Sequence, residues 1–216
     1  GSDGYIDALK KASKFLGDIK TLGIEGQRMR FFESSSLQEI FSECKIINAH
    51  DEISSLRLNK DKQEINDLKK AIQISEKTLF STIKFIEENK SEMEIKQFLI
   101  QELYKNGGED LSFDPIVLAS KNSAFPHGHS SYDYKIKTGD AILFDFGATY
   151  NGYNADITRT FFFKNANEEQ KNMYDVVLKS NLAGIEKSII NNTLHDVDDS
   201  ATKVLENSKY KDFILH

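Results

Sequence analysis

Two aspartates, Asp145 and Asp156, are the residues of this chain whose type and spacing most directly suggest chemistry. They lie on either side of an Asn-Gly pair at 151–152, which separates two runs of β-branched and aromatic residues. Such a pair is the strongest short-range signal for a tight β-hairpin. A two-residue turn there places Asp145 opposite Thr158 and points both aspartates to one face, with their Cα atoms roughly 7–8 Å apart on a diagonal.

Two carboxylates held this close repel each other, and burial of an ionised carboxylate adds a further cost. The apolar runs 142–144 and 161–163 indicate core strands, so we expect that water alone does not screen the pair. A proton, a Lys or Arg side chain, or a divalent metal ion could compensate, and a structural or proton-sharing pair remains an alternative. We favour a metal ion, with the hydroxyl of Thr158 as a hydrogen-bond donor that orients Asp145.

A polar loop over 121–137 contains a Pro-His-Gly-His run, whose first histidine is His127. A loop imidazole can accept or donate a proton near neutral pH, so His127 is a candidate for proton transfer. A solvated loop histidine without a role is the alternative. The last residue, His216, ends an apolar run, and its spacing alone indicates nothing more.

Composition excludes several classes of protein. The chain has 216 residues, of which 39% are hydrophobic and 29% charged, so it can bury a sizeable core. Its net charge of −6 argues against nucleic acid or an anionic membrane as the main partner. No apolar run approaches the roughly 18 residues of a membrane span. The single cysteine, Cys44, cannot form an internal disulfide and is expected to be a buried apolar residue, which favours a cytoplasmic location.

The pattern of apolar residues, caps and breakers indicates which elements position these residues. A small α/β segment comes first, long helices follow, and the hairpin comes after them. Capping boxes begin helices at Ser91 and at Asn167. The expected helices cover 5–20, about 35–43, 60–87, 91–106, 167–190 and 196–207; the expected strands cover 22–25, 45–48, 116–120 and the hairpin 141–163, and an apolar segment begins at 212.

Around the hairpin, residues 144–147 (Phe-Asp-Phe-Gly) and 153–160 (Tyr-Asn-Ala-Asp-Ile-Thr-Arg-Thr) resemble the metallopeptidases with the pita-bread fold. The match is to the branch of aminopeptidase P and prolidase rather than to methionine aminopeptidase or the metal-free creatinase. Residues 123–127 resemble the histidine loop of that branch, and 56–65 resemble the start of the first catalytic helix. Residues 210–216 resemble the strand that opens a His-x-x-Gly-His motif.

The resemblance implies an α+β fold, a partial pita-bread catalytic domain with a curved antiparallel sheet. It assigns residues 53–216 to this incomplete domain, and residues 1–52 to the tail of a smaller α/β N-terminal domain of the creatinase type plus a linker. It also implies that the chain is truncated at its C-terminal side. The remaining metal ligands would then lie beyond residue 216, and this piece alone would be inactive.

The same resemblance implies a centre of two divalent metal ions, manganese first, with cobalt or zinc as alternatives. Asp145 would bind one ion and Asp156 would bridge both. His127 would assist proton transfer or hold the scissile region, and His216 would contact the substrate. Such ions lower the pKa of a bridging water molecule to about 7.

The function implied is hydrolysis of Xaa-Pro bonds, with release of the N-terminal residue before proline as in aminopeptidase P. The expected partner is a peptide with proline at its second position; we expect no nucleic acid and no membrane, and allow for a homodimer. Prolidase, which splits Xaa-Pro dipeptides, is the first alternative. A non-catalytic pita-bread protein that binds peptides, histones or RNA is the second.

Overall fold

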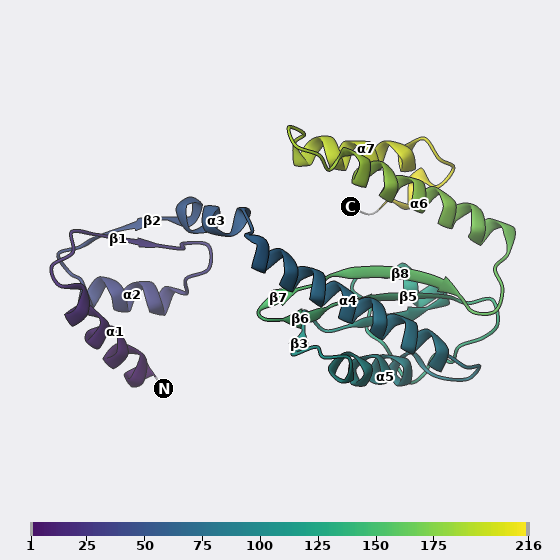
Figure 1. Cartoon of the computed structure of the whole chain (residues 1–216), viewed down its shortest axis with the longest axis horizontal. Helices are drawn as coiled ribbons and strands as arrows, with labels where there is room; N and C mark the ends of the chain where they lie inside the picture. Colours follow the sequence, from purple (N-terminus) through teal and green to yellow (C-terminus); the bar gives the residue numbers. More distant parts are fainter. Residues whose placement is uncertain (1, 215–216) are drawn as a thin grey trace. The chain divides into compact units, whose positions relative to one another are not determined.

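The computed structural model describes residues 2–214 and divides the chain into two compact units, Gly1–Ile65 and Asn66–His216 (Figure 1). The division falls inside helix α4 (Lys62–Phe85). The domain organisation inferred from the sequence, with a tail over 1–52 and an incomplete catalytic domain over 53–216, therefore remains a prediction.

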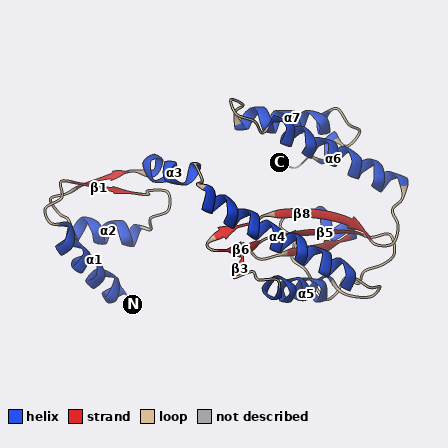
Figure 2. Cartoon of the chain, viewed as in Figure 1, coloured by secondary structure: helices blue, strands red, loops and turns tan. Residues whose placement is uncertain are grey.

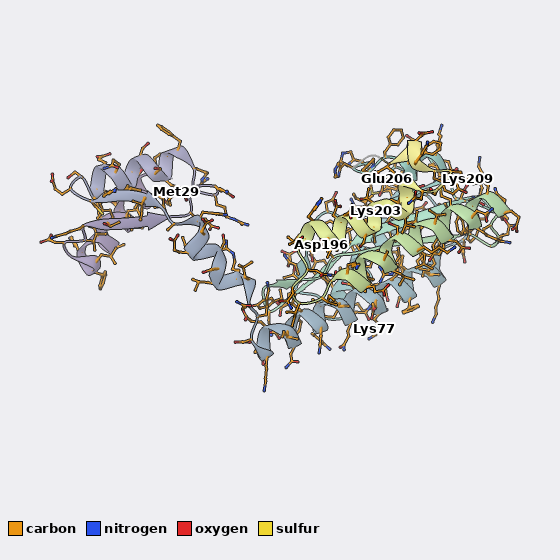
Figure 3. The ribbon with its side chains drawn as sticks, turned by 90° about the horizontal axis from the view of Figure 1, so that it is seen from above. Met29, Lys77, Asp196, Lys203, Glu206 and Lys209 are labelled. Atoms are coloured by element: carbon orange, nitrogen blue, oxygen red, sulfur yellow. The ribbon has the colours of Figure 1, made fainter. Side chains whose placement is uncertain are left out.

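The first unit is a small α/β layer with its own apolar cluster. Its elements are α1 (Ser2–Leu16), β1 (Thr21–Ile24), α2 (Phe31–Ile40), β2 (Lys45–Asn48) and α3 (His50–Leu58), with β1 and β2 parallel. Leu37, Phe41 and Cys44 form the buried cluster, against which Met29, labelled in Figure 3, packs. Cys44 is 6% exposed and free, which confirms the expected buried thiol.

Three details of this unit differ from the sequence prediction. Helix α1 ends at Leu16 rather than at residue 20, just before Gly17 with its φ of +62°. Helix α2 begins at Phe31 rather than near residue 35, because the carboxylate of Glu33 accepts the backbone N–H of Arg30 at 2.9 Å and satisfies the helix start there. Helix α3 was not predicted as a separate element; it ends at Leu58, four residues before α4 begins.

The second unit contains the helices and strands that hold the candidate site (Figure 2). Its helices are α4, α5 (Glu92–Lys105), α6 (Glu168–Lys187) and α7 (Leu194–Glu206). Both predicted capping boxes are confirmed, since the side chains of Ser91 and Asn167 each accept the backbone N–H three residues on. None of the helices in residues 2–214 is both long and apolar enough to cross a lipid bilayer.

Two three-stranded antiparallel sheets carry the hairpin. The strands are β3 (Asp110–Leu111), β4 (Ile116–Ala119), β5 (Ala141–Phe146), β6 (Ala148–Tyr150), β7 (Tyr153–Asn154) and β8 (Ile157–Phe162), in the orders β4-β5-β8 and β3-β6-β7. The predicted turn is confirmed: Tyr150 pairs with Tyr153, and Asn151 and Gly152 have φ of +48° and +77°. This is the left-handed pair that a tight hairpin turn requires.

One face of the β4-β5-β8 sheet builds the core of the second unit. Ile142, Phe144 and Phe146 of β5 alternate along the strand and are all 0–1% exposed. They share a buried cluster with Ile74 of α4 and Ile95, Leu99 and Leu103 of α5. The period-two alternation of β5 therefore leaves Leu143 and Asp145 on the opposite face of the sheet.

Helices α6 and α7 pack closely against each other. The hydroxyl of Ser180 donates to the carbonyl of Ala201 at 2.8 Å, and a Cβ added at Gly184 would lie 3.5 Å from the Cβ of Ala201. Past α7, Lys209 (labelled in Figure 3) lies 2.5 Å from the Glu169 carboxylate at the start of α6. This ion pair joins the end of the described chain to the α6 N-terminus.

The strand that the family resemblance implies over 210–216 is wrong for the residues that are described there. Residues Lys211–Phe213 form a short 3₁₀ helix, with the N–H of Phe213 donating to the carbonyl of Tyr210 at 3.0 Å. A strand needs a neighbour for its backbone groups, and within residues 2–214 no strand pairs with this segment. His216 and its predicted role lie outside the described residues.

Candidate metal centre and histidine loop

The hairpin brings Asp145, Asp156 and Thr158 to one face. Asp145 pairs with Thr158 in the antiparallel ladder of β5 and β8, as the sequence predicted. The same register holds on both sides of Asp156, at the Phe146–Ile157 pair and at the turn. Asp156 lies between β7 and β8, but buried Ala155 and Ile157 alternate with exposed Asp156 and Thr158, which indicates that Asp156 shares the face of Thr158 and Asp145.

This face is open, which corrects one expectation. The apolar residues of β5 that indicated burial lie on the other face, whereas Asp145 is half-buried and Asp156 is exposed. Burial of the ionised carboxylate therefore costs little at Asp156 and only part of the full penalty at Asp145, so the expectation that burial demands a compensating ion was wrong for the described residues. What remains is the proximity of two like charges on one face.

No basic side chain neutralises the pair within the described residues. Neither Asp145 nor Asp156 forms an ion pair there, and the neighbouring Arg159 donates instead to the backbone carbonyl of Thr158 at 2.8 Å. The alternative of a Lys or Arg partner is therefore not supported in residues 2–214. A cation from outside the chain remains the species whose charge matches the pair.

Thr158 contacts Asp145 directly. Its hydroxyl Oγ1 donates a hydrogen bond of 2.9 Å to Oδ1 of Asp145. A donor on one carboxylate oxygen restrains the orientation of the group. Hydrogen bonds of this kind orient metal ligands and raise their affinity.

At Gly147, between β5 and β6, the two arms of the hairpin approach each other closely. A Cβ at this position would lie 1.7 Å from the carbonyl oxygen of Ala155 and 2.9 Å from Oγ of Ser112. The backbone carbonyl of Gly147 also accepts the N–H of Ser112 at 3.0 Å. The close approach divides the hairpin into two sheets at the level of Asp156, a break that the sequence analysis did not predict.

The donors fit part of a site for a hard divalent cation. Two carboxylates supply oxygen ligands of the type that manganese and magnesium prefer. Among residues 2–214, however, no group of three or more His, Cys, Asp or Glu side chains is arranged to hold a metal ion. The described part of the chain therefore presents two matching ligands and not a complete set.

His127 comes from a different element of the same unit. It is exposed and lies in the loop that follows β4 and the 3₁₀ helix η1 (Ser120–Ala124). Strand β4 runs beside β5, with Ile116 opposite Asp145 and Ala119 opposite Ile142. The histidine loop therefore leaves the sheet that carries Asp145, and it does so at the end of β4 away from that aspartate.

The sequence analysis missed Glu92. This first residue of α5 is fully buried, and its carboxylate accepts three hydrogen bonds from the segments around the histidine loop. A glutamate in the first turn of a helix is common because it complements the helix dipole. No signal in the sequence separated this one from an ordinary exposed residue.

Comparison with known proteins supplies the family. Residues 66–216 match metallopeptidase family M24. The chain is 34% identical over 207 residues to the Xaa-Pro dipeptidase of Pyrococcus furiosus, covering 94% of this chain and 58% of the relative. It thus spans little more than half the length of that protein.

Two solved structures share the fold. The X-Pro aminopeptidase of Thermotoga maritima superposes with a TM-score of 0.86 at 34% identity, over 96% of this chain and 58% of that one. The prolidase of Pyrococcus horikoshii gives 0.88 at 31% identity, over 96% and 59%. With the α+β arrangement of helices and antiparallel sheets described above, this confirms the partial pita-bread fold. The chain belongs to metallopeptidase family M24.

Proposed function

We propose that the protein containing this chain hydrolyses Xaa-Pro peptide bonds with the help of two divalent metal ions, manganese first. The observation that carries the proposal is the open face where Asp145 and Asp156 stand together without a cationic partner in the described residues. Because the chain belongs to a metallopeptidase family, we interpret the two aspartates as metal ligands.

The chain's own residues have distinct parts in this proposal. Asp145 and Asp156 hold the ions, and the Thr158 hydroxyl keeps Asp145 in the orientation that binds. When bound, the ions supply a water molecule of lowered pKa and polarise the scissile carbonyl. His127 holds the scissile region or passes a proton to it, a task for which an imidazole is suited near neutral pH. We also propose that His216 contacts the substrate.

There are two candidate substrate classes for this reaction. We put release of the N-terminal residue before proline first, as in aminopeptidase P. Cleavage of Xaa-Pro dipeptides is the second candidate, favoured by the name of the Pyrococcus furiosus relative. Assay of the full-length natural protein with an Xaa-Pro-Xaa tripeptide and with an Xaa-Pro dipeptide separates them, because a dipeptidase turns over only the shorter substrate. A cytoplasmic location and a homodimer remain expectations that fractionation and light scattering test.

The decisive experiment compares Asp156→Ala with Asp198→Ala, a matched control on the exposed side of α7. In the full-length protein we expect about two manganese or cobalt ions per chain. Asp156→Ala should lose at least one ion and all measurable turnover while its circular dichroism stays unchanged; Asp198→Ala should retain both. Normal turnover in Asp156→Ala refutes the assigned role. A wild-type protein that binds no metal supports the non-catalytic binding protein instead.

A further inference from the structure

Glu92 joins three separate parts of the second unit through one buried carboxylate. Its Oε1 accepts the backbone N–H of Ala119 at 2.8 Å and the side-chain amide of Asn122 at 3.0 Å. Its Oε2 accepts the backbone N–H of Ser131 at 3.2 Å. The residue is 0% exposed, so no water takes the place of the carboxylate as the acceptor for these donors if it is removed.

These donors lie on both sides of His127 in the chain. Ala119 and Asn122 precede the histidine, and Ser131 follows it. One carboxylate therefore closes the base of the loop that presents His127. The backbone of α5 adds to this closure, since the N–H of Met93 donates to the carbonyl of Ser131 at 3.0 Å.

A second link closes the loop beside the first. The hydroxyl of Ser130 donates to the carbonyl of Val117 at 2.8 Å and accepts the N–H of Val117 at 3.2 Å, so it binds β4 as a neighbouring strand would. Inside the loop, the N–H of Gly128 donates to the carbonyl of Phe125 at 3.1 Å, which forms a turn around His127. The exposed histidine thus lies in a loop whose two ends are joined by hydrogen bonds to buried Glu92 and Ser130.

The hydrogen bonds that close the loop require a carboxylate at position 92. Three donors converge on Glu92, and an ionised carboxylate offers acceptor positions on both oxygens. A glutamine has the same shape but only one acceptor oxygen, so its NH₂ group would face an N–H donor at one end of the loop. The N-terminal position on α5 also stabilises the negative charge through the helix dipole.

We propose that Glu92 is a positioning residue, which fixes the loop and thereby places His127 for peptide hydrolysis. This inference rests on the proposed function only in its second half, because the closure of the loop by Glu92 is a structural role. The two halves are tested separately.

Hydrogen exchange tests the closure. Glu92→Gln is compared with Glu102→Gln, which changes another largely buried glutamate of α5 that pairs with Lys105 and does not touch the loop. We expect amide exchange over 119–131 to become at least about tenfold faster in Glu92→Gln alone, with exchange over 142–146 unchanged. Unchanged exchange at the loop, or equal acceleration throughout the unit, overturns the closure.

Kinetics of the full-length, metal-loaded protein test the positioning. We expect Glu92→Gln to lower kcat by about 10–100-fold with little change in KM, because a small misplacement of a reacting group has this effect. In a His127→Ala background the same change should cost less than twofold, since the histidine that it positions is gone. Full additivity of the two losses overturns the positioning role.

The metal content of each variant is measured alongside, and it should match the wild type if Glu92 acts through the loop. Loss of metal in Glu92→Gln overturns the inference. If the wild type itself hydrolyses no Xaa-Pro peptide, the proposed function fails and the positioning half fails with it. The exchange result still decides whether Glu92 closes the loop.

Discussion

Replacement of Gly147 by alanine should be among the most damaging single-methyl additions in the second unit. The new Cβ would lie 1.7 Å from the carbonyl oxygen and 2.5 Å from the carbonyl carbon of Ala155. Both atoms belong to the backbone, so no side-chain rotation can relieve the overlap. The two arms of the hairpin must separate at the level of Asp156.

The cost follows from what that separation breaks. Overpacking of a well-packed site typically costs about 1–3 kcal/mol, and backbone overlap belongs at the upper end. The N–H of Ser112 donates to Gly147 at 3.0 Å and the N–H of Ala155 donates to Ala148 at 2.9 Å. Weakening these two bonds adds about 1–2 kcal/mol. We therefore expect Gly147→Ala to lower the free energy of unfolding by about 3–5 kcal/mol.

Urea unfolding followed by circular dichroism measures this loss, with Gly152→Ala as the control. Gly152 has φ of +77° but no atom within 4 Å of an added Cβ. Its replacement therefore costs only the backbone strain, about 1–2 kcal/mol. A loss below 1 kcal/mol in Gly147→Ala, or one no larger than in Gly152→Ala, would refute the argument from close approach.

Three further predictions concern single side chains. Hydrogen bonds from Ser91 and the charge of Lys135 hold the pKa of Glu94 at about 2. In the folded state Glu94 therefore takes up its proton at a lower pH than in the unfolded state, so the free energy of unfolding should fall as the pH drops from about 4.5 to 2. Urea unfolding should show a less steep fall in Glu94→Gln. Thr158→Val should weaken manganese binding by about tenfold, measured by calorimetry, because it removes the donor to the Asp145 ligand. Asn151→Ala should cost about 1 kcal/mol in thermal unfolding, since alanine tolerates its φ of +48° less well.

The hairpin could be predicted from the sequence because its signals are local. The Asn-Gly pair sets the turn, and a turn of fixed length sets the register that pairs Asp145 with Thr158. The capping box at Ser91 is equally local and was equally well predicted. Elements that are bounded by such local signals can be predicted without knowledge of the rest of the fold.

What the sequence could not supply depended on tertiary contact. The apolar neighbours of Asp145 suggested burial, but which face of β5 is covered depends on where α4 and α5 pack. The need for glycine at 147 depends on the approach of Ala155, and the hydrogen bonds of Glu92 depend on donors 27 to 39 residues away. The strand that the family resemblance implied over 210–216 lacked a neighbour among the described strands, and residues Lys211–Phe213 formed a 3₁₀ helix instead.

The shared register of the two sheets has an evolutionary consequence. A strand's side chains alternate strictly, so an insertion at the tip of the hairpin that shifts the pairing by one residue would turn every side chain on one arm to the opposite face. Phe144 would then face the residues that now oppose Asp145, and an acid would enter the apolar interior. Changes in the length of the tip should therefore be eliminated by selection, and substitutions there should be restricted to residues that tolerate the left-handed conformation of Asn151 and Gly152.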